Sequence, residues 1–524
     1  MAKLNKKLLG KKRKVRNSGD KQIAEAINKR TKGQALNLPS VSIGSLAEKN
    51  MMDYGSYTIY SRAIPMLYDG MKPVHRRVIY AMDKMGLIYN VAHRKAAKVV
   101  GDTMGNYHPH GDAAIYGAMV GLSTGNGTTP LPLIDGQGNW GNFDGVGPFR
   151  GAAAPRYTEC RMTKYATEML TSRAYMDSDV IPYVDNYDGS EKEPLYLPSL
   201  LPTLFLLGAE GIATGVSINM PAYSYPSVLA ATKVLFKTGK GVKAARKLVP
   251  IQRWGAELLS SQADLDEYHK TGNGKLEWQA PYEVVREKNN TIIKLSGLPP
   301  TSYDTLYKSI MGDEKRAGIK GVYSVIDLTD KKSRATGSVR IEISIRDEAA
   351  ITPVKKKLNV SESYRAAVTL LVKNDDPEAP LKVGFEPWSP VVILEKWLEW
   401  RIELEKRLIK SLVRDNDKEL ARLRLMILAA SKLDIIFSIL KAKKGSKVEM
   451  IEKQLKVTNE EAKTIWQMAV RQLDALNADD LKANVVRIEA ENKKLKTDYK
   501  APNLRILKQI EALPANSPND KATK

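Results

Sequence analysis

The stretch from Ser389 to about Leu440 repeats charged and apolar residues with a helical period, and it limits the possible folds more than any other segment. Ser389 and Pro390 are a typical helix start, because serine caps the helix and proline fits its first turn. Four apolar residues then recur at the three-four spacing of a coiled-coil seam: Leu420, Leu423, Ile427 and Ala430. The sequence therefore predicts a long helix that must pack against a partner helix.

Two more helices are predicted after the break at residues 441–446. A capping box at Thr458–Glu461 opens the second, and Asn477–Asp480 opens the third, which is expected to run to about Lys496. A long outgoing helix, a small helical cluster at its far end and a helix running back along it would make a long antiparallel coiled coil. A plain helical bundle is the alternative interpretation of the same periodicity.

The region before these helices mixes strand and helix patterns. Residues 338–345 alternate strictly and place Val339, Ile341, Ile343 and Ile345 on one face of a strand, and residues 291–296 form a second strand. A chain of 524 residues is also too long for one hydrophobic core. We therefore expect an α+β protein with several domains.

The net charge of +23, from 82 Lys+Arg and 59 Asp+Glu, predicts a polyanionic partner, with nucleic acid as the leading candidate. Residues 1–45 form a basic arm that is expected to be flexible and to bind phosphates without sequence preference. Part of this arm also resembles a nuclear-localisation signal, which any basic arm can do. The sequence contains no apolar run of membrane-spanning length, and the single cysteine, Cys160, is typical of a reducing compartment. We expect a protein that works inside the cell without a membrane partner.

Four of the five histidines, His75, His93, His108 and His110, lie within residues 75–110. Helices are predicted for residues 76–85 and, with Asp112 as the cap, for residues 113–122. The second helix is a candidate for binding in a DNA groove, although an ordinary capped helix has the same pattern. The glycine-rich run 135–141 has no Walker lysine, so it is not an ATP loop, and it is a candidate wing of a winged helix.

Arg156 and Tyr157 form the main candidate for chemistry. A phenol ordinarily has a pKa near 10 and is a weak nucleophile until its proton leaves. An adjacent guanidinium can stabilise both the phenolate and the charge on a pentacoordinate phosphorus. Attack on DNA would give a phosphotyrosyl ester that keeps the energy of the broken phosphodiester, so religation would need no ATP. A purely structural tyrosine is the alternative for the dipeptide alone.

Two motifs upstream of Tyr157 add titratable and cationic groups. Residues 69–77 contain Lys72, His75, Arg76 and Arg77 after a glycine turn, and residues 107–112 hold two imidazoles on either side of a proline. These histidines could exchange protons or bind phosphate oxygens. A His-x-His metal pair is the competing interpretation, but no cysteine lies near it and no carboxylate motif completes a site. No metal is therefore assigned to this chain.

Several segments, in this order, resemble the DNA-cleaving subunit of type IIA topoisomerases, the gyrase A and topoisomerase IV class. They are Gly55–Pro65, Asp69–Arg77, Tyr107–Asp112, Asp135–Gly141, Ala152–Glu159, Val184–Lys192 and Gly211–Pro221. The resemblance extends over about residues 50–500. The split, short form of the chain is also similar to the medium subunit of T-even phage topoisomerases.

The resemblance implies a domain for each part of the chain. A winged-helix (CAP-like) DNA-cleavage domain is implied for residues 46–183 and an α/β tower domain for residues 184–387. A coiled coil with a helical C-gate is implied for residues 388–500, followed by a C-terminal tail at 501–524.

The resemblance also implies roles for individual residues. Tyr157 would form a bond to the 5′ phosphate of each strand, with Arg156 beside the scissile phosphate, and Ile212 would be an apolar wedge that bends the DNA. The family positions that hold DNA near the cut are Arg62, Lys72, His75, Arg76, Arg77, His108 and His110.

Two departures from the family matter. Ala113 and Gly117 stand where relatives usually carry a hydroxyl and an acid that anchor quinolone drugs through a metal–water bridge, which predicts weak quinolone sensitivity. The chain is also expected to lack a β-rich DNA-wrapping domain, so relaxation or decatenation is expected rather than active supercoiling.

The partners follow from the same resemblance. We expect double-stranded DNA, a homodimer through the C-gate, and separate TOPRIM and ATPase subunits that bind Mg²⁺ and ATP. The expected location is cytoplasmic and nucleoid-associated, with a phage-encoded origin open. An architectural DNA-binding protein without catalysis is the main alternative function. A tyrosine recombinase or nicking enzyme would need a different arrangement of Arg and His around its tyrosine.

Overall fold

The computed structural model describes residues 42–123, 131–141, 151–252, 255–287, 290–329, 339–365, 370–374, 381–384, 388–441, 445–467, 478–517 and 519. The predicted basic arm thus lies outside the described residues up to position 41. The chain divides into two units, Met1–Ser56 and Tyr57–Lys524. The described part of the first unit is helical, because α2 (Ile43–Thr58) begins there. None of the helices in the described ranges has the length and hydropathy of a bilayer-spanning segment.

Three helices and a small antiparallel sheet form the first part of the second unit. The helices contact one another and are α3 (Pro73–Lys84), α4 (Ala96–Asn106) and α5 (Asp112–Leu122). The sheet has the order β1-β3-β2, with β1 (Arg94–Lys95), β2 (Ile134–Gln137) and β3 (Glu159–Met162). Their apolar side chains share one core that includes Val78, Met82, Val99, Ile115, Met119 and Cys160. Two short π-helices flank this group: η1 (Ile59–Ala63) and η3 (Ala166–Leu170).

The starts of two of these helices differ from the sequence prediction. Helix α3 begins at Pro73 rather than Arg76, because proline fits the first helical position without losing a needed N–H. The prediction that Asp112 caps α5 was wrong: Gly111 occupies the cap and makes no side-chain cap bond. Asp112 is instead the first residue of the helix, where a carboxylate interacts favourably with the helix dipole.

The middle of the chain contains two larger sheets. The five-stranded sheet has the order β10-β11-β18-β7-β6, and the four-stranded sheet has the order β12-β13-β17-β16. The strands are β6 (Ala209–Ala213), β7 (Val216–Met220), β10 (Glu257–Leu258), β11 (Asn273–Gln279), β12 (Tyr282–Arg286), β13 (Thr291–Leu295), β16 (Val322–Asp327), β17 (Ile341–Ile345) and β18 (Asn359–Arg365).

The same region holds short helices and two-stranded sheets. The helices are α6 (Thr203–Leu207), α7 (Tyr225–Thr238), α8 (Gly241–Ala245), α9 (Gln262–Thr271), α10 (Tyr303–Met311), η4 (Glu348–Ala350) and α12 (Ile351–Leu358). The paired strands are β4 (Tyr183–Asp185) with β5 (Lys192–Pro194), β8 (Ala222–Tyr223) with β9 (Pro250–Ile251), β14 (Gly312–Asp313) with β15 (Arg316–Ala317), and β19 (Leu370–Lys373) with β20 (Leu381–Gly384).

The four-stranded sheet has a hydrophobic core separate from the one under α3–α5. The alternating residues Val339, Ile341, Ile343 and Ile345 are all buried in it, together with Val354 of α12. The predicted strand at 338–345 is confirmed for residues 341–345, which form β17, and the predicted strand at 291–296 is confirmed for residues 291–295, which form β13. The two cores, together with the mixture of helices and sheets, confirm the predicted α+β class.

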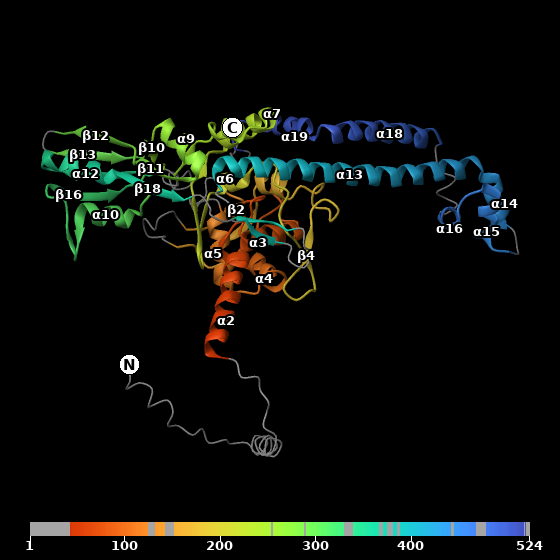
Figure 1. The fold of residues 1–524 in the computed structure, drawn as a ribbon, viewed down its shortest axis with the longest axis horizontal. Coiled ribbons are helices and arrows are strands. Elements are labelled where there is room, and N and C mark those ends of the chain that lie inside the picture. Colours follow the sequence, from red (N-terminus) through yellow and green to blue (C-terminus); the bar gives the residue numbers. More distant parts are fainter. Residues whose placement is uncertain are drawn as a thin grey trace, which may run out of the picture. The chain divides into compact units, whose positions relative to one another are not determined.

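A pair of long helices follows, in which α13 (Pro390–Ser431) runs beside α18 (Ala478–Lys500) and α19 (Pro502–Glu511) (Figure 1). Ser389 caps α13 by accepting a hydrogen bond from the Val392 amide at 3.3 Å, as predicted. The ion pairs Arg505–Glu405 and Arg424–Glu489 join rising numbers on α13 to falling numbers on α18 and α19. The two sides of the pair are therefore antiparallel.

Three of the four predicted seam residues of α13 face α18, whereas the fourth, Ala430, is half-buried and lies outside this cluster. Leu420 and Leu423 are buried with Leu481 and Ile488, and Ile427 packs against this cluster. A polar layer follows along the pair, where Asn416 donates to the Asn492 side chain at 3.0 Å and Asn492 donates to Asp417 at 2.7 Å. Such a layer fixes the register of paired helices at a cost in stability.

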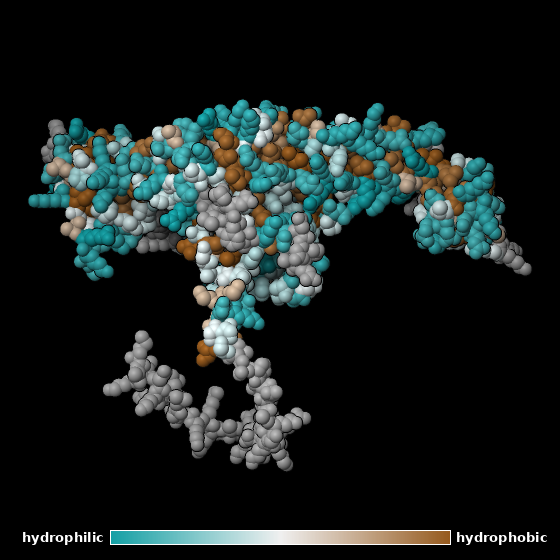
Figure 2. Space-filling model, viewed as in Figure 1, coloured by the Kyte–Doolittle hydropathy of each residue, from teal (hydrophilic) through white to brown (hydrophobic). Residues whose placement is uncertain are grey.

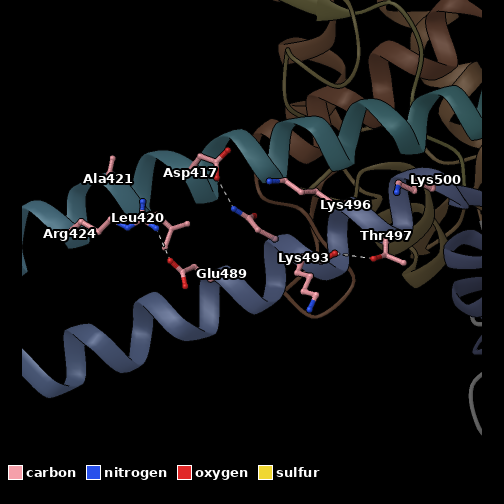
Figure 3. Close-up of a pocket in the computed structure, with 10 residues that line it drawn as sticks. Asp417, Leu420, Ala421, Arg424, Glu489, Lys493, Lys496, Thr497 and Lys500 are labelled. Carbon is pink, nitrogen blue, oxygen red and sulfur yellow. Dashed lines mark hydrogen bonds and ion pairs between the residues drawn. The ribbon is translucent and has the colours of Figure 1, made fainter.

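A groove lies between α13 and α18 at this polar layer (Figure 3). Asp417, Leu420 and Arg424 line it from α13, whereas Glu489 and Lys493 line it from α18. The surface of the helix pair is largely hydrophilic in the view of Figure 2. The polar layer and the groove thus interrupt the apolar packing between α13 and α18.

The end of the helix pair departs from the prediction in three ways. The first long helix ends at Ser431, and α14 (Leu433–Lys441) begins after a break at Lys432. The sequence analysis missed α15 (Lys447–Leu455), which packs with α14 and α16 (Asn459–Gln467) around a small core. It also missed α19, which lies within the predicted tail and buries Ile506 and Ile510. The capping box before α16 is confirmed, since the Thr458 amide donates to Glu461 at 2.8 Å.

Candidate functional site

Arg156 and Tyr157 lie in a tight turn directly before β3. The Tyr157 amide donates to the Ala154 carbonyl at 2.9 Å, which closes the turn. The Tyr157 side chain is 63% exposed, and the Arg156 guanidinium lies over its ring, 4.8 Å from the centroid. The phenol therefore stands at the surface with a cation against its face.

The start of α4 holds this turn from one side. The amide of Ala96 donates to the Thr158 carbonyl and the amide of Ala97 donates to the Pro155 carbonyl, both at 3.0 Å. The first N–H groups of a helix have no partner within the helix, so the carbonyls of the turn satisfy them. The turn is thereby attached to a rigid element rather than to a loose loop.

Helix α5 and the glycine-rich run 135–141 hold the turn from another side. The Tyr116 hydroxyl bonds to the Ala153 carbonyl at 2.6 Å and to the Thr158 hydroxyl at 2.9 Å. The indole N–H of Trp140 is 3.2 Å from each of the carbonyls of Gln137 and Glu159. A Cβ at Gly136 would lie 2.6 Å from Trp140, so this position has room only for glycine. The predicted wing, residues 135–141, is described, whereas the following residues 142–150 lie outside the described part of the chain.

His108 is buried beside Arg77. The Arg77 guanidinium forms two 2.7 Å bonds to Glu193 and contacts Nδ1 of His108 at 3.0 Å. Because arginine can only donate, Nδ1 of His108 accepts, and the proton of the neutral ring is on Nε2. Burial, followed by the charges of Arg77 and His110, lowers the pKa of His108 to about 4. His108 is therefore neutral at pH 7.

His110 is exposed, and its ring meets that of His108 edge to face, with centroids 4.6 Å apart. Its Nε2 bonds to the Tyr57 hydroxyl. The Arg77 bond occupies the Nδ1 lone pair of His108, which argues against the competing interpretation of a His-x-His metal pair. Within the described residues, no group of three or more His, Cys, Asp or Glu side chains is placed to hold a metal ion.

Arg76 is buried and paired inside the protein. Its side chain is buried and bonds to both carboxylate oxygens of Asp69, at 2.7 and 3.0 Å, and to the Met71 carbonyl at 3.0 Å. Asp69 is fully buried and also accepts from the Leu197 amide at 2.9 Å. The resemblance implied a DNA contact for Arg76, and its buried partner Asp69 was not evident in the sequence, because the partner of a buried arginine cannot be told from local pattern.

Lys72 and His75 are half-buried near the β6–β7 hairpin. The Lys72 ammonium donates to the Glu210 carbonyl at 2.7 Å, two residues before Ile212. Burial is the main cause of the lowered pKa of His75, about 3, and the charges of Lys72 and Arg76 act in the same direction. Lys72 thus faces the hairpin, and both side chains line a cavity together with Glu210.

Ile212 is 84% exposed on the β6–β7 hairpin. A Cβ at Gly211 would lie 2.3 Å from the Ala63 carbonyl, so the hairpin packs directly on the backbone of η1. Arg62, which precedes Ala63, is exposed. The structure therefore brings Arg62, Lys72 and the hairpin of Ile212 into one neighbourhood, although they are far apart in the sequence.

The site residues fall into two classes. Tyr157, Arg156, Arg62, His110 and Ile212 are exposed, whereas Lys72, His75, Arg77, Arg76 and His108 are partly or fully buried. Hydrogen-bond partners inside the protein hold four of the buried group: Lys72, Arg76, Arg77 and His108. Sequence reasoning missed the residues that hold these side chains and the Tyr157 turn in place, above all Tyr116, Glu193 and Asp69. A phenol beside a fixed cation, on a rigid turn of a basic protein, has the chemistry for attack on a phosphodiester.

Acid is expected to destabilise the protein through its buried histidines. His75 and His108 have pKa values of about 3 and 4, below the ordinary 6.5, so the unfolded chain binds these protons more readily. Their stabilising contribution is complete above about pH 6.5 and is lost as the pH falls from 6.5 toward 4. Each can add a slope of at most about 1.4 kcal/mol per pH unit.

Thermal unfolding between pH 7.5 and 4.5 tests this expectation. The midpoint should fall with pH, and the fall should be shallower in His108→Gln, which keeps an acceptor for Arg77 but does not titrate. An identical pH profile in the wild type and the variant would contradict the assignment of His108 as a neutral acceptor.

Comparison with known proteins gives a consistent result. The family model for the A subunit of DNA gyrase/topoisomerase IV matches residues 62–510, a range that includes every candidate site residue. The DNA gyrase A subunit of Helicobacter pylori is 31% identical over 458 residues, covering 85% of this chain and 52% of that protein. The DNA gyrase A subunit of Staphylococcus epidermidis is 32% identical over 460 residues, covering 84% of this chain and 48% of that protein.

A third relative, the DNA gyrase A subunit of Halalkalibacterium halodurans, is 30% identical over 467 residues, with 87% of this chain and 52% of that protein covered. The chain spans about half the length of the curated relatives it matches. Since the family model covers most of the chain and all of the site, the chain belongs to the family of DNA gyrase and topoisomerase IV A subunits.

Proposed function

We propose that this chain is the DNA breakage-reunion subunit of a type II DNA topoisomerase, with Tyr157 as the nucleophile. The observation that carries the proposal is the exposed Tyr157 phenol, held on a braced turn with the Arg156 guanidinium over its ring. The phenolic oxygen would lose its proton, attack the phosphorus and form a 5′-phosphotyrosyl ester while the bond to the 3′ oxygen breaks. Religation reverses this step, because the 3′ hydroxyl attacks the ester and releases Tyr157.

Arg156 would stabilise the negative charge that develops on the phosphorus oxygens. Mg²⁺, held by a partner subunit, would stabilise the leaving 3′ oxygen. We assign both ATP and Mg²⁺ to separate TOPRIM and ATPase subunits.

The exposed residues are the best candidates for direct DNA contacts. Arg62 and His110 can reach phosphates, and Ile212 protrudes from its hairpin as an apolar wedge would. We propose that Lys72, His75, Arg77 and His108 shape this surface. A phosphate contact would require Lys72, Arg77 and His108 to exchange their present hydrogen-bond partners. Arg76 supports the surface from within through Asp69.

We further propose a separate domain for each of three parts of the chain. Helices α3–α5 with the β1-β3-β2 sheet support a winged-helix domain at 46–183, and the two larger sheets support a tower at 184–387. The antiparallel helices and the α14–α16 cluster support a coiled coil with a dimerising C-gate at 388–500.

Reconstitution tests the proposed function. The chain, mixed with a gyrase B-type subunit, ATP and Mg²⁺, is expected to change the linking number of a supercoiled plasmid in steps of two. The architectural alternative would be favoured if the chain bound and bent DNA but changed no linking number with any of several gyrase B-type subunits.

Drug sensitivity gives a separate prediction. Ala113 and Gly117 are exposed on α5, and a Cβ at Gly117 would meet no atom within 4 Å. Ciprofloxacin is therefore expected to trap cleaved DNA weakly with the wild type. The double variant Ala113→Ser, Gly117→Asp should fold normally and lower the required drug concentration by about tenfold or more, as a gained bridging contact of about 1.4 kcal/mol would.

Cleaved plasmid at graded drug concentrations measures this effect. Strong trapping by ciprofloxacin in the wild type would contradict it, as would equal sensitivity of the double variant.

A further inference from the structure

Tyr116 lies on α5, outside every motif that the sequence analysis assigned to chemistry. Its hydroxyl reaches both ends of the segment Ala153–Thr158, which contains Arg156 and Tyr157. It is 2.6 Å from the Ala153 carbonyl oxygen at one end and 2.9 Å from the Thr158 hydroxyl at the other. One phenolic oxygen therefore closes the loop that presents the nucleophile.

The direction of these bonds follows from their chemistry. A carbonyl oxygen can only accept, so the Tyr116 proton goes to Ala153, and the Thr158 hydroxyl donates to the Tyr116 oxygen. Burial raises the pKa of Tyr116, which keeps this proton in place at neutral pH. The Tyr116 hydroxyl thus donates to Ala153 and accepts from Thr158, so both of its hydrogen bonds go to the same segment.

The neighbours of Tyr116 fix the place of its ring. The ring packs against Trp140, with centroids 5.6 Å apart, and Thr158 is fully buried. The α4 amides hold the carbonyls of Pro155 and Thr158 from another side. Tyr116 is therefore the side chain that sets the distance between α5 and the turn of Tyr157.

We infer that Tyr116 is a positioning residue for DNA cleavage, which closes the Ala153–Thr158 loop and so fixes the Tyr157 phenol relative to α5. This inference rests on the proposed function of Tyr157. Displacements of about 1 Å at a reacting atom can cost about 100-fold in rate. A hydroxyl that makes no contact with DNA would in this way control the rate of the chemical step.

Tyr116→Phe is the direct test, because it removes the hydroxyl and keeps the ring against Trp140. The reaction is single-turnover formation of the covalent adduct with a gyrase B-type subunit, Mg²⁺ and a short duplex, followed over a range of DNA concentrations. We expect the rate at saturating DNA to fall about 10- to 100-fold. The DNA concentration for half-saturation and the thermal midpoint should stay near the wild-type values.

Tyr183→Phe is the matched control. Tyr183 is also half-buried, and its hydroxyl also donates to a backbone carbonyl, that of Met176 at 2.9 Å, but it lies away from the loop. This variant should form the adduct at the wild-type rate. Thr158→Val removes the other side-chain partner, and we expect its effect and that of Tyr116→Phe to be less than additive in the double variant.

The outcomes separate this inference from the proposed function. Adduct formation at the wild-type rate by Tyr116→Phe, or full additivity with Thr158→Val, would overturn the positioning role and leave the function of Tyr157 intact. A lower thermal midpoint with an unchanged rate per folded molecule would also overturn it, because the hydroxyl would then serve stability alone. No adduct with the wild type would instead refute the proposed function.

Discussion

Replacing Tyr157 with phenylalanine is expected to abolish the covalent protein–DNA adduct while leaving DNA binding intact. The substitution removes one oxygen from a side chain that is 63% exposed, so little packing is lost. Loss of the nucleophile in covalent catalysis lowers rates by on the order of 10⁴-fold or more. Adducts trapped with detergent on end-labelled DNA measure the effect.

Tyr187→Phe is the control for this experiment. Tyr187 is likewise an exposed tyrosine, and its hydroxyl donates to the Gly105 carbonyl at 2.8 Å. This variant should form adducts like the wild type. Adducts at the wild-type level in Tyr157→Phe would show that another residue is the nucleophile.

Replacing Glu405 with alanine is expected to cause the largest loss of stability among single substitutions in the helix pair. Glu405 is fully buried on α13 and accepts from Arg505 at 2.7 Å and from the Tyr175 hydroxyl at 2.5 Å. Its ion pair with Arg401, also fully buried, is 3.1 Å long. Removal of the carboxylate would leave the Arg401 charge buried without its partner.

Breaking a buried ion pair in this way costs about 3–5 kcal/mol. Glu405→Ala should unfold at a clearly lower temperature or urea concentration than the wild type, as measured by circular dichroism. The unfolding midpoint of Glu405→Gln should lie between those of the wild type and Glu405→Ala, because the amide of glutamine keeps an acceptor but loses the charge. The cluster around Glu405 connects α13, α19 and the segment of Tyr175. The end of the helix pair where α13 meets α19 should therefore unfold first.

Glu403→Ala is the matched control on the same helix. Glu403 pairs with Arg407 at 3.5 Å, but its side chain is 55% exposed. Exposed pairs of this kind contribute only about 0–1 kcal/mol. Equal unfolding midpoints for Glu403→Ala and Glu405→Ala would contradict the account of the buried cluster.

Local chemistry explains which elements the sequence could predict. The start of α13 follows from Ser389 and Pro390, and the start of α16 follows from the capping box at Thr458–Glu461, because each signal lies within four residues. The strand β17 follows from strict alternation of apolar residues. Helix α15 also has a local start signal, because Ser446 caps it by accepting from the Glu449 amide at 3.5 Å, but the sequence analysis overlooked this signal. By contrast, α19 is a short helix whose apolar face packs against α7 and α13.

The same distinction applies to the site. The exposed position of Tyr157 beside Arg156 agrees with a pattern that is visible in the sequence. The partners of Arg77 and Tyr116 are not visible there, since Glu193 and Thr158 lie 116 and 42 residues away along the chain. Arg76 shows the limit most clearly: a basic motif alone does not tell a surface cation from a buried one.

The Tyr157 oxygen is expected to become joined to a DNA phosphate, and peptide mapping tests this bond most directly. A reaction with a gyrase B-type subunit, Mg²⁺ and duplex DNA would be stopped with denaturant, digested with nuclease and protease, and analysed by mass spectrometry. We predict a nucleotide attached through its 5′ phosphate to the peptide that contains Tyr157. A nucleotide on any other residue, or none in a reaction that is changing plasmid linking number, would contradict the account.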